Sequence, residues 1–177
     1  MDIKSVNMIL EMEYNNACKT KTDIHLHLPT LREYASKCSS VIELGVRDGQ
    51  STRAFLVEDV SLKSIDIYMD NNVKMLFEVA KQNKLRSLEY MIANDLEIEL
   101  PEVDMIFIDT DHTYNQLSAE LKLHGNKARK YLAFHDTAEP FVSETMPAIL
   151  EFLVNNPNWR VCHHNKDCHG LTVLARI

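Results

Sequence analysis

Two short segments place carboxylates and imidazoles directly after strongly apolar runs. The first is Asp109-Thr-Asp111-His112 and the second is His135-Asp136. An apolar strand that ends in several charged groups is costly to fold unless those groups have partners or a ligand. Carboxylates at the ends of adjacent strands can share a hard divalent cation such as magnesium. We therefore predict a cation site built from Asp109 and Asp136, with His135 as a third ligand or simply a neighbour.

A glycine turn follows the first apolar run of the chain. In Glu43-Leu-Gly45-Val46-Arg47-Asp-Gly49-Gln-Ser51 the two glycines stand four residues apart, so the backbone can pass close to a ligand and then turn into a helix. The N-terminus of that helix offers free N–H groups. The spacing is G-x-x-x-G rather than G-x-G-x-x-G, which disfavours a nicotinamide oxidoreductase. An ordinary strand–turn–helix junction is the structural alternative.

The ends of the next two predicted strands also carry polar residues. Asp66, followed by Ile67, comes about 20 residues after the glycine turn, where a carboxylate can accept hydrogen bonds from both hydroxyls of a ribose. Asp70 is a less favoured substitute, and a surface turn is the alternative. Asn94 and Asp95 follow the third strand, where either one could contact a ligand or cap a helix.

The elements that position these residues alternate between strands and helices. The apolar periodicity predicts helices over 5–18, 49–58, 72–82, 114–129 and 141–153, and strands over 40–45, 62–67, 88–92, 103–109, 131–134, 159–163 and 171–175. Pro29 can begin a further helix, and Pro147 predicts a kink or a split in the last one. We therefore expect an α/β fold, a Rossmann-like doubly wound sheet of about seven strands, mostly parallel with an antiparallel C-terminal hairpin.

Composition narrows the class of protein. The chain has 177 residues, a net charge of -7 and no long apolar run, so we expect a cytoplasmic protein that neither spans a membrane nor binds nucleic acid non-specifically. Its four cysteines are widely spread, and we expect free thiols. The Cys/His-rich segment 162–169 does not have the usual zinc spacing, and it predicts a polar turn between the last two strands. His25, His27 and His124 are expected to be surface or loop histidines.

Three segments together resemble class I S-adenosylmethionine (SAM) dependent methyltransferases: Val41–Ser51, Phe107–Tyr114 and Phe134–Thr137. They are most similar to small-molecule O-methyltransferases, and within these to the metal-dependent sugar methyltransferases that act on macrolide, aminocoumarin and rhamnose sugars and share a domain with cephalosporin hydroxylase-like proteins. The resemblance runs from about His27 to the end of the chain and includes Gly170–Leu174. It implies SAM as the cofactor and a divalent metal, magnesium or manganese.

The resemblance also implies which residues hold the cofactor. The glycine turn would approach the methionine part of SAM, and the acid before it would hold the amine directly or through water. Asn94 or Asp95 would flank the adenine. The cofactor-binding residues implied in this way are Glu43, Gly45, Val46, Arg47, Gly49, Ser51, Asp66, Ile67, Asn94, Asp95 and Asp109.

For the reaction, the resemblance implies a metal ligand at Asp109 and a general base at Asp111 or His112. The relatives often end the next strand with an acidic pair, whereas this chain has His135-Asp136, and imidazole suits zinc and manganese better than magnesium. The expected reaction is methyl transfer to a hydroxyl of a small-molecule or glycan acceptor. A metal and a base near pH 7 would help remove its proton.

Two other classes of function compete with this hypothesis. A nucleic-acid methyltransferase is disfavoured by the net charge and by the absence of an Asn/Asp-Pro-Pro-aromatic signature after the fourth strand. A non-catalytic SAM-binding or scaffold module stays open, because the chain offers little material for an acceptor lid beyond residues 1–30 and the loop near Glu139. We expect one domain overall, with residues 1–30 as a helical cap and 31–177 as the methyltransferase domain, and a homodimer is one assembly that this size allows.

Overall fold

The structure is a computed structural model, and it describes residues 1–83 and 86–177. Its strands are β1 (Ser40–Leu44), β2 (Ser61–Asp66), β3 (Leu88–Ile92), β4 (Val103–Ile108), β5 (Ala128–His135), β6 (Trp159–Asn165) and β7 (Leu171–Arg176). They form one sheet in the order β3-β2-β1-β4-β5-β7-β6. The strands β1 to β5 are parallel, and β7 is antiparallel to both β5 and β6. The predicted fold class, with its antiparallel C-terminal hairpin, is confirmed.

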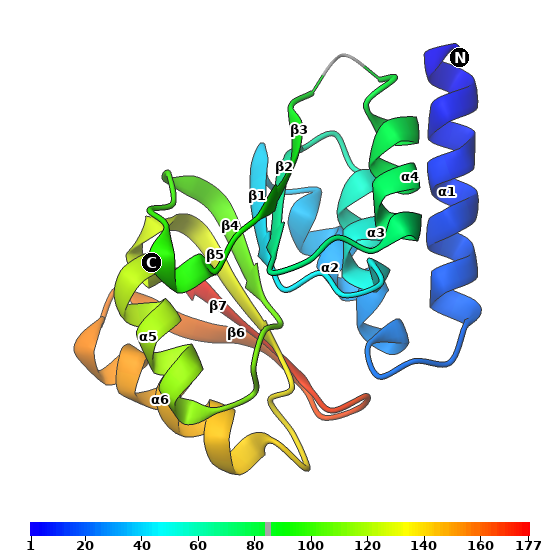
Figure 1. Ribbon diagram of the computed structural model, residues 1–177. Coiled ribbons are helices and arrows are strands. Elements are labelled where there is room, and N and C mark those ends of the chain that lie inside the picture. The colour runs from blue at the N-terminus through cyan, green and yellow to red at the C-terminus, as the bar shows by residue number, and fades with distance from the viewer. Residues whose placement is uncertain (84–85) are drawn as a thin grey trace.

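Helices cover both faces of this sheet (Figure 1). The helices α1 (Ile3–Lys19), α2 (Leu28–Ala35), α3 (Gln50–Leu56) and α4 (Asn71–Ala80) lie on one face, and α5 (Tyr114–His124) and α6 (Val142–Asn155) lie on the other. Short 3-10 turns span His25–His27, Asp95–Glu97 and Gly125–Lys127. Among the described residues, no helix combines the length and the apolar character that crossing a bilayer requires.

The central strand β4 shows how the sheet separates two cores. All six of its residues are buried. Met105 and Phe107 belong to the apolar core between the sheet and the helices α1 to α4. Ile106 and Ile108 belong to the core under α5 and α6. This alternation is the period of two that a strand imposes on its side chains. The apolar run of β4 is therefore explained by burial on both faces, as in other parallel sheets.

The same period decides where the first residues after β4 and β5 point. Ile108 of β4 pairs with Phe134 of β5, and both side chains lie in the core under α5 and α6. The next residues, Asp109 and His135, therefore point to the opposite face, beside α2 and the glycine turn. Strand register brings these two polar side chains together at the carboxyl edge of the sheet.

Several element boundaries differ from the prediction. The helix expected over 114–129 ends at His124, tightens into a 3-10 turn at Gly125, and gives way to β5 at Ala128. The strand expected over 131–134 is longer because the charged residues Arg129 and Lys130 still belong to it and pair with Asp104. These two side chains interrupt the apolar pattern without ending the strand.

The N-terminal part of the chain and the last helix also differ in detail. The loop expected over 25–29 contains a 3-10 turn, and α2 begins at Leu28, one residue before Pro29. Of the kink or split predicted at Pro147, the split is wrong, since α6 runs unbroken from Val142 to Asn155 with the proline inside it. Pro147 lies in the second turn of that helix, and the packing of Ala148 and Ile149 in the core stabilises the helix around it.

The helix α1 contributes directly to the core. Its buried residues are Val6, Leu10, Tyr14 and Ala17, and they belong to the same apolar cluster as α2, α3, α4 and the sheet. In Figure 1, α3 and α4 lie between α1 and the strands. The N-terminal helix is thus an outer layer fixed by apolar burial.

We predict that Leu10→Ala lowers the free energy of unfolding by about 2–5 kcal/mol, the usual cost of emptying a buried leucine site. Leu10 is 2% exposed, whereas Met8 on the same helix is 61% exposed. Met8→Ala is therefore the matched control and should change stability by less than about 0.5 kcal/mol. Urea denaturation followed by circular dichroism measures both values. Equal effects of the two substitutions would contradict the packing of α1.

Candidate active site

Two connected hollows open at the carboxyl ends of the parallel strands. The larger has a volume of about 440 Å³ and includes the exposed side chains Ile67 and Tyr68 in its wall. The smaller, of about 110 Å³, extends toward Ser51 and His112. Both hollows share Gly45, Val46, Arg47, Asp109 and Thr110 in their walls. A hollow of this size at the strand ends of a doubly wound sheet is the expected place for a small ligand.

The glycine turn is fixed by two contacts. Gly45 has a φ of +81°, and a Cβ atom there would lie 2.1 Å from the carbonyl oxygen of Asp109, so no other residue fits. The Asp66 carboxylate accepts hydrogen bonds from the backbone N–H groups of Val46 at 2.7 Å and Arg47 at 2.9 Å. Asp66 therefore holds the turn in place and also forms part of the larger hollow's wall.

Glu43 lies behind this turn and lines neither hollow. Its fully buried carboxyl group accepts hydrogen bonds from Ser51 at 2.6 Å, Thr52 at 2.9 Å and Ser64 at 2.5 Å. Burial raises the pKa of Glu43 to about 7, and the three hydroxyl groups limit that rise. The structure thus gives Glu43 an anchoring role for α3, and the contact with the cofactor's amine that the resemblance implies stays a prediction.

A second buried carboxyl group lies under the larger hollow. Glu120 of α5 accepts hydrogen bonds from Thr110 at 2.5 Å and from Gln116 at 2.8 Å. Burial raises its pKa to about 8, and the nearby Asp95 carboxylate adds to the rise. His124, expected at the surface, is buried and contacts the Asp95 carbonyl oxygen at 2.9 Å. These contacts fix the positions of Thr110, Gln116 and Asp95 in the wall of the hollow.

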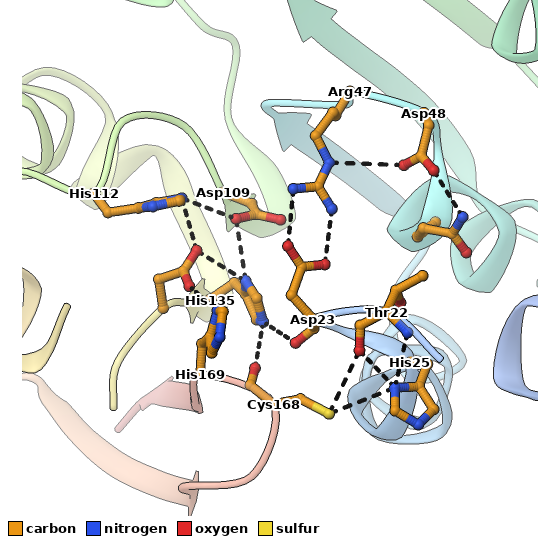
Figure 2. A network of polar contacts seen from close by, with 12 residues as sticks. Thr22, Asp23, His25, Arg47, Asp48, Asp109, His112, His135, Cys168 and His169 are labelled. Atoms are coloured by element: carbon orange, nitrogen blue, oxygen red, sulfur yellow. Dashed lines mark hydrogen bonds and ion pairs between the residues drawn. The ribbon is translucent and has the colours of Figure 1, made fainter. Parts of the chain in front are cut away.

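Carboxylates and imidazoles converge where the smaller hollow ends (Figure 2). His112 Nε2 lies 2.7 Å from Asp136 Oδ2 and 3.7 Å from Asp109 Oδ1. His135 Nδ1 lies 3.0 Å from Asp136 Oδ2 and 3.2 Å from Asp109 Oδ1. His169, from the β6–β7 turn, places Nδ1 3.3 Å from Asp136 Oδ1. We call these five residues the carboxylate–imidazole cluster.

The hydrogen-bond partners of His135 fix which ring nitrogen keeps its hydrogen when the other one loses it. Its Nε2 lies 3.1 Å from the carbonyl oxygen of Asp23 and 2.9 Å from that of Cys168, and both are acceptors only. Nε2 must therefore carry a hydrogen, and Nδ1 faces the two carboxylates. A histidine that donates one ring N–H to backbone carbonyls and directs the other nitrogen at carboxylates has the arrangement usual for a metal ligand.

The charges of the cluster balance through protons. Hydrogen bonds with Asp109 and Asp136 raise the pKa of His112 to about 9. Burial lowers the pKa of His135, but hydrogen bonds with the same two carboxylates raise it more, to about 11. Burial opposes ionisation of Asp109 and Asp136, yet contacts with His112 and His135 lower both pKa values overall. At neutral pH two imidazolium ions thus neutralise two carboxylates.

A divalent cation fits the same place. Asp109, His112 and Asp136 each offer a ligand atom, and these atoms all lie within 4.8 Å of one another. Asp136 Oδ1 is buried and accepts no hydrogen bond from the described residues. One dication would balance the negative charge of the two carboxylates, as the two imidazolium ions now do. Its binding would therefore release protons from the histidines.

The segment between α1 and α2 closes one side of the site. Arg47 of the glycine turn forms two hydrogen bonds with the Asp23 carboxylate, at 2.9 and 2.7 Å, and the Asp23 carbonyl oxygen accepts from His135. His27 is buried and its Nε2 contacts the Asp167 carbonyl oxygen at 2.6 Å. Figure 2 shows Asp23 between Arg47 and His135, so this segment joins the two halves of the site.

The structure brings most of the predicted site residues together. The walls of the two hollows contain Val46, Arg47, Ser51, Asp66, Ile67, Asn94, Asp95, Asp109, Asp111 and His112 along with Gly45. Glu43 and Gly49 line neither hollow. Sequence reasoning missed His169, which was assigned to a polar turn, and also Asp23 and Glu120. The adjacent Cys168-His169 was the only signal for the first of these.

Another hollow, of about 410 Å³, lies between α5 and α6. Its wall includes Tyr114 and Glu151, which hydrogen-bond to each other. This hollow is away from the strand ends. Among the described residues, the group that could hold a metal ion consists of Asp109, His112 and Asp136, and none of them lines this hollow. The chemistry therefore belongs to the two hollows at the strand ends.

Comparison with solved structures places the chain in the class I methyltransferase fold. A methyltransferase from Geobacter sulfurreducens is similar with a TM-score of 0.64 and 15% identity, over 99% of this chain and 91% of the other. The O-methyltransferase from Bacillus cereus in complex with S-adenosylhomocysteine (SAH) gives 0.63 and 12% identity, over 98% and 91%. The N-methyltransferase NodS from Bradyrhizobium japonicum, also with SAH, gives 0.63 and 14%, over 97% and 98%.

No family model matches the chain. No curated protein sequence matches it either. Because the similar structures include both an O- and an N-methyltransferase at low identity, the likeness establishes the fold. The chemistry of the acceptor must be argued from the site.

We predict that Glu43 makes stability depend on pH. Its folded pKa of about 7 exceeds the ordinary value of 4.5, so the folded state binds its proton more tightly, and the free energy of unfolding falls as pH rises from about 5 to 7. Relative to wild type, Glu43→Gln should gain about 3 kcal/mol between pH 4 and pH 8. Denaturation at several pH values measures the difference. Glu78→Gln, at an exposed position on α4, is the control, and a parallel response of both variants would contradict the assignment.

Proposed function

We propose that the chain is a SAM-dependent methyltransferase that transfers a methyl group to a hydroxyl of a small molecule or sugar. One observation carries the proposal. Asp109 lies in the wall of both hollows and also belongs to the carboxylate–imidazole cluster. A ligand in the larger hollow would thus reach the cluster, where an acceptor hydroxyl could lose its proton.

The larger hollow fits the nucleoside part of SAM. Ile67 and Tyr68 are exposed apolar side chains in its wall, and they can cover the face of an adenine ring. Asn94 and Asp95 lie in the same wall and offer polar groups to the base edge. Asp66 bonds the glycine turn through Oδ2, and its Oδ1 accepts one longer hydrogen bond, from Tyr68 N–H at 3.3 Å, so Oδ1 can also accept from a ribose hydroxyl.

The smaller hollow would take the methionine part. Its wall combines the glycine turn with Ser51 and Arg47, and it leads toward His112. The bound cofactor would supply an electrophilic methyl group on a sulfonium ion. The role of the chain is then to hold the acceptor oxygen in line with that methyl group and to remove its proton.

His112 and Asp111 are the two candidates for the base. His112 Nε2 points at Asp136, and its raised pKa means that it carries a proton at neutral pH. We propose His112 as the group that accepts the proton of the acceptor hydroxyl; a divalent cation held by Asp109 and Asp136 would take over the charge balance that now keeps His112 protonated. Asp111 is exposed and lines the larger hollow, so it is the alternative base.

A divalent metal fits the cluster and would lower the pKa of the acceptor hydroxyl. We propose Asp109, His135 and Asp136 as its ligands, and we keep His112, which also offers a ligand atom beside the two carboxylates, as the base. The fixed tautomer of His135 and the buried, unbonded Oδ1 of Asp136 support this set. The assignment of a sugar acceptor rests on the three sequence segments that resemble sugar O-methyltransferases.

We predict that SAH binds with a micromolar dissociation constant in calorimetric titration, in the presence of magnesium, manganese or EDTA. Ile67→Asp should weaken binding at least about tenfold, because it places a charge against the adenine site. Ile92→Asp is the matched control, since Ile92 is similarly exposed but lines neither hollow. Failure of SAH to bind in every condition would overturn the proposed cofactor.

We predict that His112→Ala lowers turnover by about 10²–10⁴-fold and leaves SAH affinity within a small factor, as loss of a general base should. The assay measures SAH formed from SAM with a panel of methyl glycosides that includes methyl rhamnoside. Asp111→Asn is the comparison, and a larger effect there would move the base to Asp111.

Asp109→Asn should abolish any response of turnover to EDTA, and a retained response would remove Asp109 from the ligand set.

A further inference from the structure

We infer that His169 is an additional ligand of the cation site, and that the site therefore selects a transition-metal dication over magnesium. The inference deepens the proposed function by naming the class of ion. It uses only the cation site of that proposal and is independent of whether SAM binds.

Asp136 is surrounded by imidazoles. Its Oδ2 faces His112 at 2.7 Å and His135 at 3.0 Å, and its Oδ1 faces His169 at 3.3 Å. The Asp136 side chain is 3% exposed, while that of His169 is 42% exposed. A cation at this carboxylate would thus meet nitrogen donors on its buried side and a solvent-accessible imidazole on its open side.

The Oδ1 atom of Asp136 is the second observation. It is buried, yet it receives no hydrogen bond from any residue that the structure describes. The Nδ1 atom of His169 lies 3.3 Å from it. An ionised oxygen left in this state costs free energy unless a cation or a proton compensates it.

The turn that carries His169 is fixed in position. His169 has a φ of +65° and Cys168 a φ of +43°, and both conformations are costly for residues with a side chain. The His169 carbonyl oxygen accepts from Ala138 N–H at 2.6 Å, and that of Cys168 accepts from His135. Gly170 allows the close approach, because a Cβ there would lie 2.5 Å from the Ala138 nitrogen. The chain thus holds this imidazole against Asp136 at an energetic cost.

The donor set decides the class of ion. Magnesium prefers an octahedron of oxygen ligands and keeps several waters. Imidazole nitrogens favour zinc, cobalt, iron and nickel, and to a smaller degree manganese. With two carboxylates and the two imidazoles of His135 and His169, the cluster matches the second group, so cobalt(II) is a suitable spectroscopic probe.

The test uses the full chain, freed of metal with EDTA and then dialysed. Calorimetric titration with cobalt(II), together with its visible absorption, should show one site in which nitrogen ligands give a spectrum distinct from the hydrated ion. Millimolar magnesium should fail to displace the cobalt. No cobalt binding, or displacement by magnesium at similar concentrations, would overturn the inference without any variant.

Variants test the ligand itself. His169→Asn removes the imidazole and keeps a residue that tolerates a positive φ, and it should weaken cobalt binding at least about tenfold and change the absorption. His164→Asn is the matched control in the same hairpin, since His164 contacts Thr172 and lies outside the cluster. Unchanged affinity and absorption in His169→Asn would exclude His169 as a ligand.

A separate titration with SAH in EDTA keeps this inference distinguishable from the proposed function. Loss of SAH binding would overturn the cofactor assignment and leave the cobalt result standing. Normal SAH binding without cobalt binding would overturn the metal site alone.

Discussion

Two carboxylates that the fold forces together, Asp109 and Asp136, impose the main physical constraint on this protein. Both are ionised, and Asp136 is almost completely buried, so positive charge must lie between them. In the structure two imidazolium groups supply that charge. Their own positions depend on elements far apart in the sequence, because His135 needs acceptors from Asp23 and Cys168. The N-terminal segment, the sheet and the C-terminal hairpin are therefore linked through one charge balance.

Much of the fold could be predicted from the sequence because its signals are local. The run of six buried residues in β4, the alternation of strands with amphipathic helices, and the glycine turn each follow from neighbouring residues. The placement of Asp109 beside His135 then follows from parallel register alone. The predicted boundary of a strand was wrong where the local pattern was ambiguous, as at Arg129 and Lys130. Their charges are balanced by Asp104, which is distant in the sequence.

The parts that could not be predicted depend on contacts between distant segments. The adjacent Cys168-His169 is the only local signal for His169, and it does not indicate that the turn folds against Asp136. Among the described residues, the four non-glycine positions with positive φ are Arg47, Asp136, Cys168 and His169, and all four lie at the site. Such conformations cost of order 1–3 kcal/mol each and persist only when surrounding contacts determine them. Sequence periodicity carries no information about that strain.

The two halves of the site differ in what they can specify. The larger hollow is built from strand ends and a glycine turn, in a fold that is similar to those of an O- and an N-methyltransferase. The carboxylate–imidazole cluster combines His135, the last residue of β5, with loop residues. Under the proposed function its imidazoles would decide which ion it takes. Arg47 and Asp23 join the halves. The Arg47 side chain extends from the glycine turn to the Asp23 carboxylate, and the Asp23 carbonyl oxygen contacts His135. Because a fold alone does not fix the acceptor, under the proposed function the choice of acceptor would depend on the cluster and on the segment that covers it.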